Sequence, residues 1–538
     1  MSAPKKLDLR GLQHGQAMVL IALAFVGLAA FIGLAVDAGI LFSNLGHLRR
    51  ATDAASLAAA NQFREGRTPP ELSAMANELL IINGLSPSGV VAKICDLSNL
   101  PGPPIYTAYH DPALCPGGVY PPAPGEPFTK EVRVEATLPV NFAFLPIIGW
   151  NSLSISADSV SQAASVDLVL IIDNSGSMAF DLCTNGINDD DPDDAIADDC
   201  NGFSTPQVGA TSDADAALCN AAGTCEPFES IRVAALGLLG NMFFPYDRMA
   251  VVSYSHLSAT EISLTAGNNF TAVQTAINNL VVSGPAPNPP CDISGGDPRG
   301  CPTTNTAAGL TRAGSLLGDN DGDPLVDSDG DGNPALDFRA DAVWIVILLS
   351  DGAANTALAE GGNPTIRDDW ICPPPGGPPG GPTWVPGFCR DPVFEVGTGA
   401  YGLDAEDAAV NAGLFVGCPD STFPQPAGCS AASPGGQGAV IFTIGYGDLV
   451  INSPACRPFY DVQVPPIPCE PNQGEELLRF IADIGDDNDP GTRACAGKPT
   501  SSSGSPENCG NYFFAADSSQ LEKVFEAIAS RIFTRITH

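Results

Sequence analysis

Beyond residue 165, five side chains with oxygen atoms that suit hard metal ions lie close to the ends of apolar segments or between these segments. Asp173, Ser175 and Ser177 follow the run VDLVLIID directly, Thr304 begins a helical pattern, and Asp351 ends the run AVWIVILLSD. Three hydroxyls and two carboxylates make an oxygen-only site, which suits Mg²⁺ or Mn²⁺ with waters in the remaining positions. Because hydroxyls bring no charge, such an ion can also bind an acidic side chain of a partner. The alternative is that both carboxylates are ordinary caps at strand ends.

Two loops carry further carboxylates with a spacing typical of calcium sites. In the first loop, DNDGD and DSDGDGN place carboxylates at alternate positions, which can surround one Ca²⁺. An EF-hand would need Glu at position 12, where Phe338 stands, so the pattern is more similar to thrombospondin-type-3 calcium repeats. The second loop, between Cys183 and Cys200, is either another Ca²⁺ loop or a solvated acidic loop. The candidate ligands of the first loop are Asp319, Asp321, Asp323, Asp327, Asp329, Asp331 and Asn333.

The elements that must position the first site are buried strands that alternate with helices. Apolar runs predict strands over 166–173, 248–255, 261–265, 342–351 and 439–448. Helical periodicity between and after these runs predicts an α/β fold with a doubly wound, mostly parallel sheet. Ligands bind such sheets at the carboxyl ends of the strands, which is where Asp173 and Asp351 stand.

The DxSxS motif at 173–177, the later Thr and the Asp after a buried strand resemble the metal-ion-dependent adhesion site of von Willebrand factor type A domains. The resemblance implies a Rossmann-like fold in which Ser175, Ser177 and Thr304 bind the ion directly. Asp173 and Asp351 would then bind it mainly through water. The matching span of residues 166–538 is far longer than a single domain of about 200 residues, so long disulfide-stapled loop insertions are expected.

A long uncharged segment near the N-terminus has the length of a membrane span. Residues 17–36 form an apolar run that, as a helix, would be about 30 Å long. An Ala-rich helical pattern continues to about Phe63, which favours a permanent anchor over the alternative, a cleaved signal peptide. Lys5, Lys6 and Arg10 favour a cytoplasmic N-terminus, with the bulk of the chain periplasmic or at the cell surface. The expected organisation is a cytoplasmic tail (1–14), a transmembrane helix that continues outward (15–63), a small α+β stalk (64–164) and a head (165–538).

Two stretches resemble the TadG-like proteins of the TadE/TadG group. They are GQAMVLIALAF, GLAVDAGILF and ATDAASLAAA within 15–60, and the stretch 132–163. The resemblance implies a role in tight-adherence (Flp/Tad-like) pilus assembly, at the inner membrane and with other pilus-assembly components as partners. Pseudopilins of this kind carry Glu at the fifth position after the cleavage-site Gly. Leu20 stands there after Gly15 and Gln16 after Gly11, which favours an uncleaved anchor.

The net charge limits which partners the chain can bind, and the cysteine content indicates the cellular compartment. The chain has 61 Asp and Glu against 24 Lys and Arg, a net charge of −37, which would repel a phosphate backbone and excludes nucleic acid as a partner. All 16 cysteines lie beyond residue 94 and none forms a CxxC motif, so we expect disulfides made in an oxidising compartment rather than free thiols. The expected neighbouring pairs are 95/115, 183/200, 219/225, 291/301, 372/389, 418/429, 456/469 and 495/509.

No motif in the chain names a reaction. It has no P-loop, HExxH or GxSxG sequence, and His256 fits a surface or core-edge position in the head. We therefore expect no enzyme, but a membrane-anchored protein of pilus assembly or surface adhesion that binds an acidic side chain of a protein ligand through Mg²⁺. The alternative is a structural envelope component with a calcium-stiffened head and no metal-dependent ligand.

Overall fold

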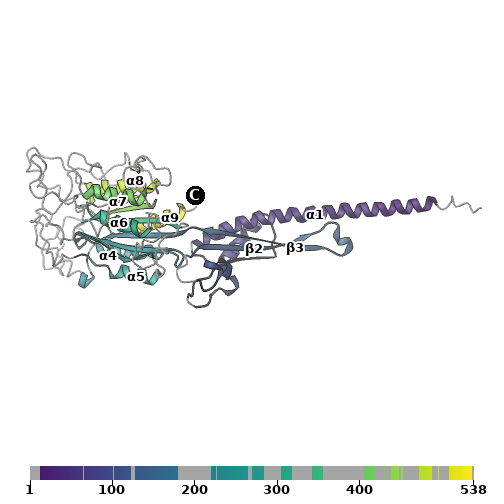
Figure 1. The fold of residues 1–538 in the computed structure, drawn as a ribbon, viewed down its shortest axis with the longest axis horizontal. Helices are drawn as coiled ribbons and strands as arrows, with labels where there is room; N and C mark the ends of the chain where they lie inside the picture. Colours follow the sequence, from purple (N-terminus) through teal and green to yellow (C-terminus); the bar gives the residue numbers. More distant parts are fainter. Residues whose placement is uncertain are drawn as a thin grey trace, which may run out of the picture. The chain divides into compact units, whose positions relative to one another are not determined.

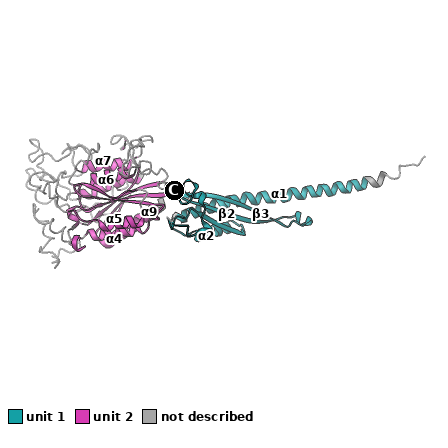
Figure 2. Cartoon of the chain, turned by 60° about the horizontal axis from the view of Figure 1, so that its bottom comes forward, with its two compact units in different colours: residues 1–123, 128–163 teal, residues 124–127, 164–538 magenta. Residues whose placement is uncertain are grey.

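A computed structural model shows that the chain divides into two compact units. The first comprises residues 1–123 and 128–163, and the second residues 124–127 and 164–538 (Figure 2). The structure describes residues 13–64, 66–100, 102–122, 128–179, 220–223, 225, 227–264, 269–283, 304–317, 342–354, 405–418, 429, 438–447, 450–451, 472–487, 495 and 508–535.

The first unit is built on one long helix, α1 (Gln13–Arg64) (Figure 1). Large apolar side chains from Met18 to Val36 are exposed along its first part, and this part is long and apolar enough to cross a membrane. The later part of α1 buries Leu48 and Phe63 where it packs on α2 and on the small sheet of this unit. The helix therefore has two parts, an apolar part that is almost entirely exposed and a part that belongs to a folded core.

The small sheet is antiparallel, with the order β1-β2-β3. Along β2, buried residues alternate with more exposed ones, as the alternation at 132–138 predicts. Strand β1 lies in the Pro- and Gly-rich stretch 86–129, where the sequence predicts no strand. The other elements of the unit are α2 (Pro69–Ile82), β1 (Gly89–Ile94), η2 (Thr107–Tyr109), η3 (Pro112–Leu114), η4 (Pro116–Gly118), β2 (Lys130–Asn141), η5 (Leu145–Ile148) and β3 (Ser152–Ala163).

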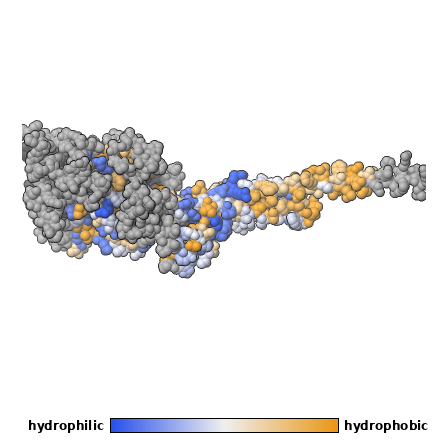
Figure 3. All heavy atoms as spheres, in the orientation of Figure 1, coloured by the Kyte–Doolittle hydropathy of each residue, from blue (hydrophilic) through white to orange (hydrophobic). Residues whose placement is uncertain are grey.

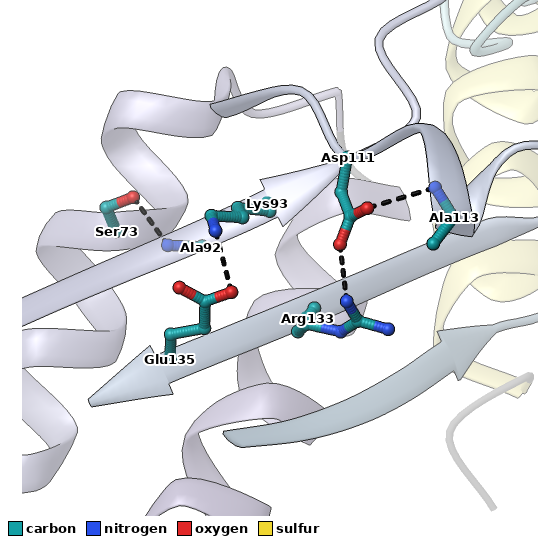
Figure 4. A network of polar contacts seen from close by, with 7 residues as sticks. All are labelled: Ser73, Ala92, Lys93, Asp111, Ala113, Arg133 and Glu135. Carbon is teal, nitrogen blue, oxygen red and sulfur yellow. Dashed lines mark hydrogen bonds and ion pairs between the residues drawn. The ribbon is translucent and has the colours of Figure 1, made fainter. Parts of the chain in front are cut away.

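Polar contacts join the strands of this sheet to the segments around it (Figure 4). Lys93 Nζ on β1 lies 2.7 Å from Glu135 Oε1 on β2. Arg133 Nη1, also on β2, lies 2.6 Å from Asp111 Oδ2, which precedes η3. Ser73 Oγ on α2 accepts a hydrogen bond from a β1 backbone N–H. The two ion pairs are partly exposed, so they contribute little stability but favour one register of the segments.

The second unit contains a six-stranded sheet with the order β6-β5-β4-β7-β8-β9. All neighbouring pairs are parallel except β5–β6. The α/β, doubly wound and mostly parallel sheet that the sequence predicts is therefore confirmed. The edge strand β6 spans residues 258–262, so both its first and its last residue lie three positions earlier than in the predicted strand 261–265. The strands are β4 (Ser165–Asp173), β5 (Arg248–Tyr254), β6 (Ser258–Ile262), β7 (Ala342–Ser350), β8 (Val440–Tyr446) and β9 (Tyr512–Ala515).

Helices cover both faces of this sheet, and each face has its own apolar core (Figures 1 and 2). Helices α4, α5 and α9 pack on one face, where Leu168 and Leu170 of β4 point. Helices α6, α7 and α8 pack on the other face, against Val169 and Ile171. The central strand is thus buried on both sides, which explains its run of five apolar residues from Leu168 to Ile172. The helices are α4 (Phe228–Leu239), α5 (Phe270–Asn279), α6 (Thr306–Leu317), α7 (Ala405–Gly417), α8 (Gln473–Asp487) and α9 (Ser518–Arg535).

Three of the predicted disulfides lie in the described part of the chain, and all three are formed. They are Cys95–Cys115, Cys418–Cys429 and Cys495–Cys509. No described cysteine is free. The other predicted pairs include cysteines outside the described residues. Each of the three bonds closes a short loop, which fits the prediction of local staples.

Candidate functional site

Three segments of the second unit meet at the carboxyl ends of β4, β5 and β7. Strands β4 and β7 are parallel neighbours with Ile172 opposite Leu349, so Asp173 and Asp351 leave the sheet side by side. The backbone N–H of Asn174 donates to the Tyr254 carbonyl (2.9 Å), and that of Asn305 to the Ser255 carbonyl (2.8 Å). These two bonds hold the loop after β4 and the start of α6 against the end of β5.

The five predicted oxygen ligands come together here. Ser175 Oγ lies 3.1 Å from Ser177 Oγ and 3.4 Å from Thr304 Oγ1. Ser177 Oγ donates to Asp351 Oδ1 at 2.9 Å. Asp173 Oδ1 accepts the backbone N–H of Ser175 at 2.9 Å. Residues that are separated by up to 178 positions in the chain thus form one cluster of hydroxyl and carboxylate oxygens.

The spacing of these oxygens fits a small divalent ion. Two neighbouring ligands of an octahedral ion at about 2.1 Å lie about 3.0 Å apart. The separations Ser175–Ser177 and Ser175–Thr304 are 3.1 and 3.4 Å, so small side-chain rotations would turn these hydrogen bonds into contacts with one ion. Asp351 Oδ1, 2.9 Å from Ser177 Oγ, lies beside these three hydroxyls, where it could bind a water of the ion. Asp351 Oδ2 is buried and has no hydrogen-bond partner among the described residues, so an acceptor remains for a cation or its water.

Burial dominates the electrostatics of the two carboxylates. Asp173 is fully buried, and the lost hydration raises its pKa to about 6, although hydrogen bonds from Ser175 and Ser350 favour the charged form. Burial, and then the charge of Asp173, raise the pKa of Asp351 well above its ordinary value. Two carboxylates in such a place favour a bound cation, because a positive charge offsets both the lost hydration and their mutual repulsion.

Two neighbours of the candidate ligands, one beside Asp351 and one beside Thr304, hold these ligands in position. Ser350 Oγ, buried at the end of β7, donates to Asp173 Oδ2 at 2.9 Å and holds that carboxylate in place. Asn305 Oδ1 accepts the N–H of Ala308 and its amide donates to the His256 carbonyl, so it caps α6 and ties the helix to the β5 end. The only sequence signal for either was its place beside Thr304 or Asp351.

The predicted Ca²⁺ ligands Asp319, Asp321, Asp323, Asp327, Asp329, Asp331 and Asn333 lie outside the described residues, as does the loop between Cys183 and Cys200. Within the described part of the chain, no three His, Cys, Asp or Glu side chains gather into a metal site. The cluster at the sheet edge has only two such residues, and its other oxygens come from hydroxyls.

The strand order with one antiparallel edge, the helices on both faces and the hydroxyl–carboxylate cluster define a von Willebrand A-type α/β fold. The N-terminal segment points to a second group. Residues 15–62 match the family model Tad, described as putative Flp pilus-assembly TadE/G-like. No curated protein matches the chain.

Several solved structures show a general likeness to the chain. The von Willebrand factor domain of the type V pili tip protein Mfa5 from Porphyromonas gingivalis is 14% identical over 70% of this chain and 97% of its own, with a TM-score of 0.30. The pilus adhesin SpaC from Lactobacillus rhamnosus GG is 13% identical over 76% of this chain and 33% of its own, with a TM-score of 0.33.

A mussel protein shows a similar likeness. The structure of proximal thread matrix protein 1 from the byssus contains zinc in its metal-ion-dependent adhesion site (MIDAS) motif. This protein is 11% identical over 69% of this chain and 46% of its own, with a TM-score of 0.28. The chain thus spans less than half of the mussel protein and about a third of SpaC.

Proposed function

We propose that this chain is a membrane-anchored, extracytoplasmic protein of tight-adherence pilus assembly or surface adhesion. Its head would bind a protein ligand through Mg²⁺ or Mn²⁺ held by Ser175, Ser177 and Thr304. Asp173 and Asp351 would neutralise the ion and bind its waters. The observation that carries the proposal is the convergence of these five oxygen-bearing side chains at one sheet edge, where Asp351 Oδ2 is buried and has no hydrogen-bond partner among the described residues.

The chemistry of the ligand follows from the donor set. With hydroxyls as the direct ligands, the protein would bring no negative charge into the first coordination shell. The ion would then remain electrophilic and prefer a carboxylate in an open position. A Glu or Asp side chain of a partner fits this requirement, and the proposal includes no enzymatic reaction. The Tad match of residues 15–62 and the apolar first part of α1 support the anchor and the place in pilus assembly.

A matched pair of hydroxyl deletions in and before one helix tests the metal site. Thr304 faces Ser175, whereas Thr311 on α6 is also buried but its hydroxyl has no partner among the described residues. We expect Thr304→Val to lower the Mn²⁺ affinity of one site in the full chain by about 10-fold or more, and Thr311→Val to leave it unchanged. Electron paramagnetic resonance of bound Mn²⁺ measures both, and equal titrations would contradict the metal assignment.

Capture of a ligand tests the adhesion role. The full chain in nanodiscs is incubated with cell-envelope extracts in Mg²⁺ or in EDTA, beside the same two variants. Capture that needs Mg²⁺, is lost in Thr304→Val and persists in Thr311→Val supports the proposal. Capture that depends on neither Mg²⁺ nor Thr304 favours the alternative role as a structural envelope component.

A further inference from the structure

The connection between β2 and β3 carries a group of exposed apolar side chains. Residues 142–151, here called the hairpin tip, contain no charged residue. Ile147, Ile148 and Trp150 are 84%, 74% and 67% exposed, and Phe144 is 44% exposed. So much contiguous apolar surface at the end of a hairpin indicates an interaction site rather than a solvated turn.

The hairpin tip lies against the apolar part of α1. Within 17–36, all of which the structure describes, Gly33 is the only buried residue. It is covered by Phe144, because a Cβ at Gly33 would lie 3.0 Å from Phe144 Cβ. One helical turn later, Asp37 accepts backbone N–H groups of the tip, from Ala143 at 2.6 Å and from Leu145 at 2.7 Å. The absence of a side chain at Gly33 and the carboxylate of Asp37 thus fix the tip to one face of α1.

This placement indicates what covers the tip. Gly33 lies three residues before the end of the apolar run, so the contact with Phe144 is about 5 Å inside that end. Apolar faces of interfacial segments are buried about 5–10 Å deep in a bilayer, and Trp is enriched at that depth. The apolar surface of α1 continues onto the hairpin tip in Figure 3. A bilayer that surrounds α1 up to Val36 would therefore also reach Ile147, Ile148 and Trp150.

We propose that the hairpin tip is a second membrane-contacting element, which enters the head-group region of the bilayer beside α1. The proposal rests on the anchor role of α1 in the proposed function. Asp37 would stay at the boundary with its carboxylate satisfied by the tip backbone rather than by water. With two contacts instead of one, the first unit would keep a fixed orientation at the membrane surface.

Brominated lipids test the contact through the native fluorophore. Trp150 is one of four tryptophans, so bromine on shallow acyl-chain positions should quench roughly a quarter of the emission of the full chain in phosphatidylcholine vesicles. Trp150→Phe should abolish this quenching. In that background, Ile148→Trp should restore it. Val160→Trp, at an exposed position of β3 about 26 Å along the strand from its first residue, Ser152, should not.

Two further variants separate the possible failures. Leu23→Trp in the Trp150→Phe background reports on α1 itself, because Leu23 is 64% exposed in the apolar run. If Leu23→Trp is quenched but Trp150 and Ile148→Trp are not, the hairpin proposal is overturned and the anchor stands. If neither is quenched, the anchor fails as well. A blue-shifted Trp150 emission without bromine quenching would mean burial by a protein partner and would also overturn the proposal.

The contact at Gly33 gives an independent control on the same helix. Gly33→Leu would push Phe144 away, since even a Cβ has contacts of 3.0, 3.1 and 3.3 Å with its side chain. A Cβ at Gly27 would meet no atom within 4 Å. We expect Gly33→Leu to reduce the Trp150 quenching at least twofold and Gly27→Leu to leave it unchanged. Equal quenching in both would refute the placement of the tip by α1.

Discussion

Gly309 sits where α6 crosses the strands that hold the candidate site, and its replacement tests how the site is positioned. A Cβ at Gly309 would lie 2.9 Å from Ile171 Cγ2 on β4 and 3.0 Å from the Tyr254 ring on β5. Carbon atoms in contact normally stay about 3.5–4.0 Å apart, so Gly309→Ala must move α6 by about 0.5–1 Å. Thr304 lies two residues before this helix and would move with it.

A second variant separates the free-energy cost of this shift from the gain in helix propensity that any Gly→Ala replacement brings. Overpacking of a core costs about 1–3 kcal/mol, while Gly→Ala in a helix gains about 1 kcal/mol. Gly237 on α4 is an exposed helix position whose Cβ would meet no atom within 4 Å, so Gly237→Ala has only the gain. The propensity terms cancel between the two variants. We therefore expect Gly309→Ala to be less stable than Gly237→Ala by about 1–3 kcal/mol.

Hydrogen exchange of the full chain in nanodiscs measures this difference, because the slowest amides of β4 report the unfolding of the second unit. The same samples with Mn²⁺ report the site. We expect Gly309→Ala to weaken Mn²⁺ binding, since Thr304 Oγ1 already lies 3.4 Å from Ser175 Oγ and would recede further. If both variants gain stability equally and bind Mn²⁺ alike, close packing of α6 does not position the site.

Three further predictions concern single polar contacts. Ser350→Ala removes the donor to Asp173 Oδ2, and we expect Mn²⁺ affinity to fall about 10–100-fold by titration, with no loss of fold. Asp167→Asn removes the carboxylate from its ion pair with the buried Arg248 guanidinium, and we expect a loss of about 3–5 kcal/mol in denaturant unfolding, which a double replacement by apolar residues recovers. Asp517 caps α9, and its pKa is lowered by the Ser519 hydroxyl and the Gln520 N–H, so its stabilising effect is present above its ordinary pKa of 3.8 and is lost as pH falls through the lowered pKa. Asp517→Ala should remove that acid dependence in thermal unfolding at pH 2–5.

Local sequence indicated most strands of the second unit and the five candidate ligands. The run at 166–173 is apolar at almost every position because β4 is covered on both faces, and this pattern is visible without any partner. Asp173 and Asp351 could be placed together because carboxyl ends of parallel strands meet at one edge. The three observed disulfides were also predictable from local sequence, because the two cysteines of each bond lie close together in the chain.

Contacts between distant residues could be found only in the tertiary structure. The sequence does not show that Ser350 donates to Asp173, because the bond depends on which strand lies beside β4. Strand β1 is short and lies among Pro and Gly residues, and it is stabilised by pairing with β2, 35 or more residues away. In the sequence, the hairpin tip is only a short apolar stretch. The tertiary structure places Phe144 against Gly33 and the tip backbone against the Asp37 carboxylate. Such contacts depend on long-range packing, which no local pattern encodes.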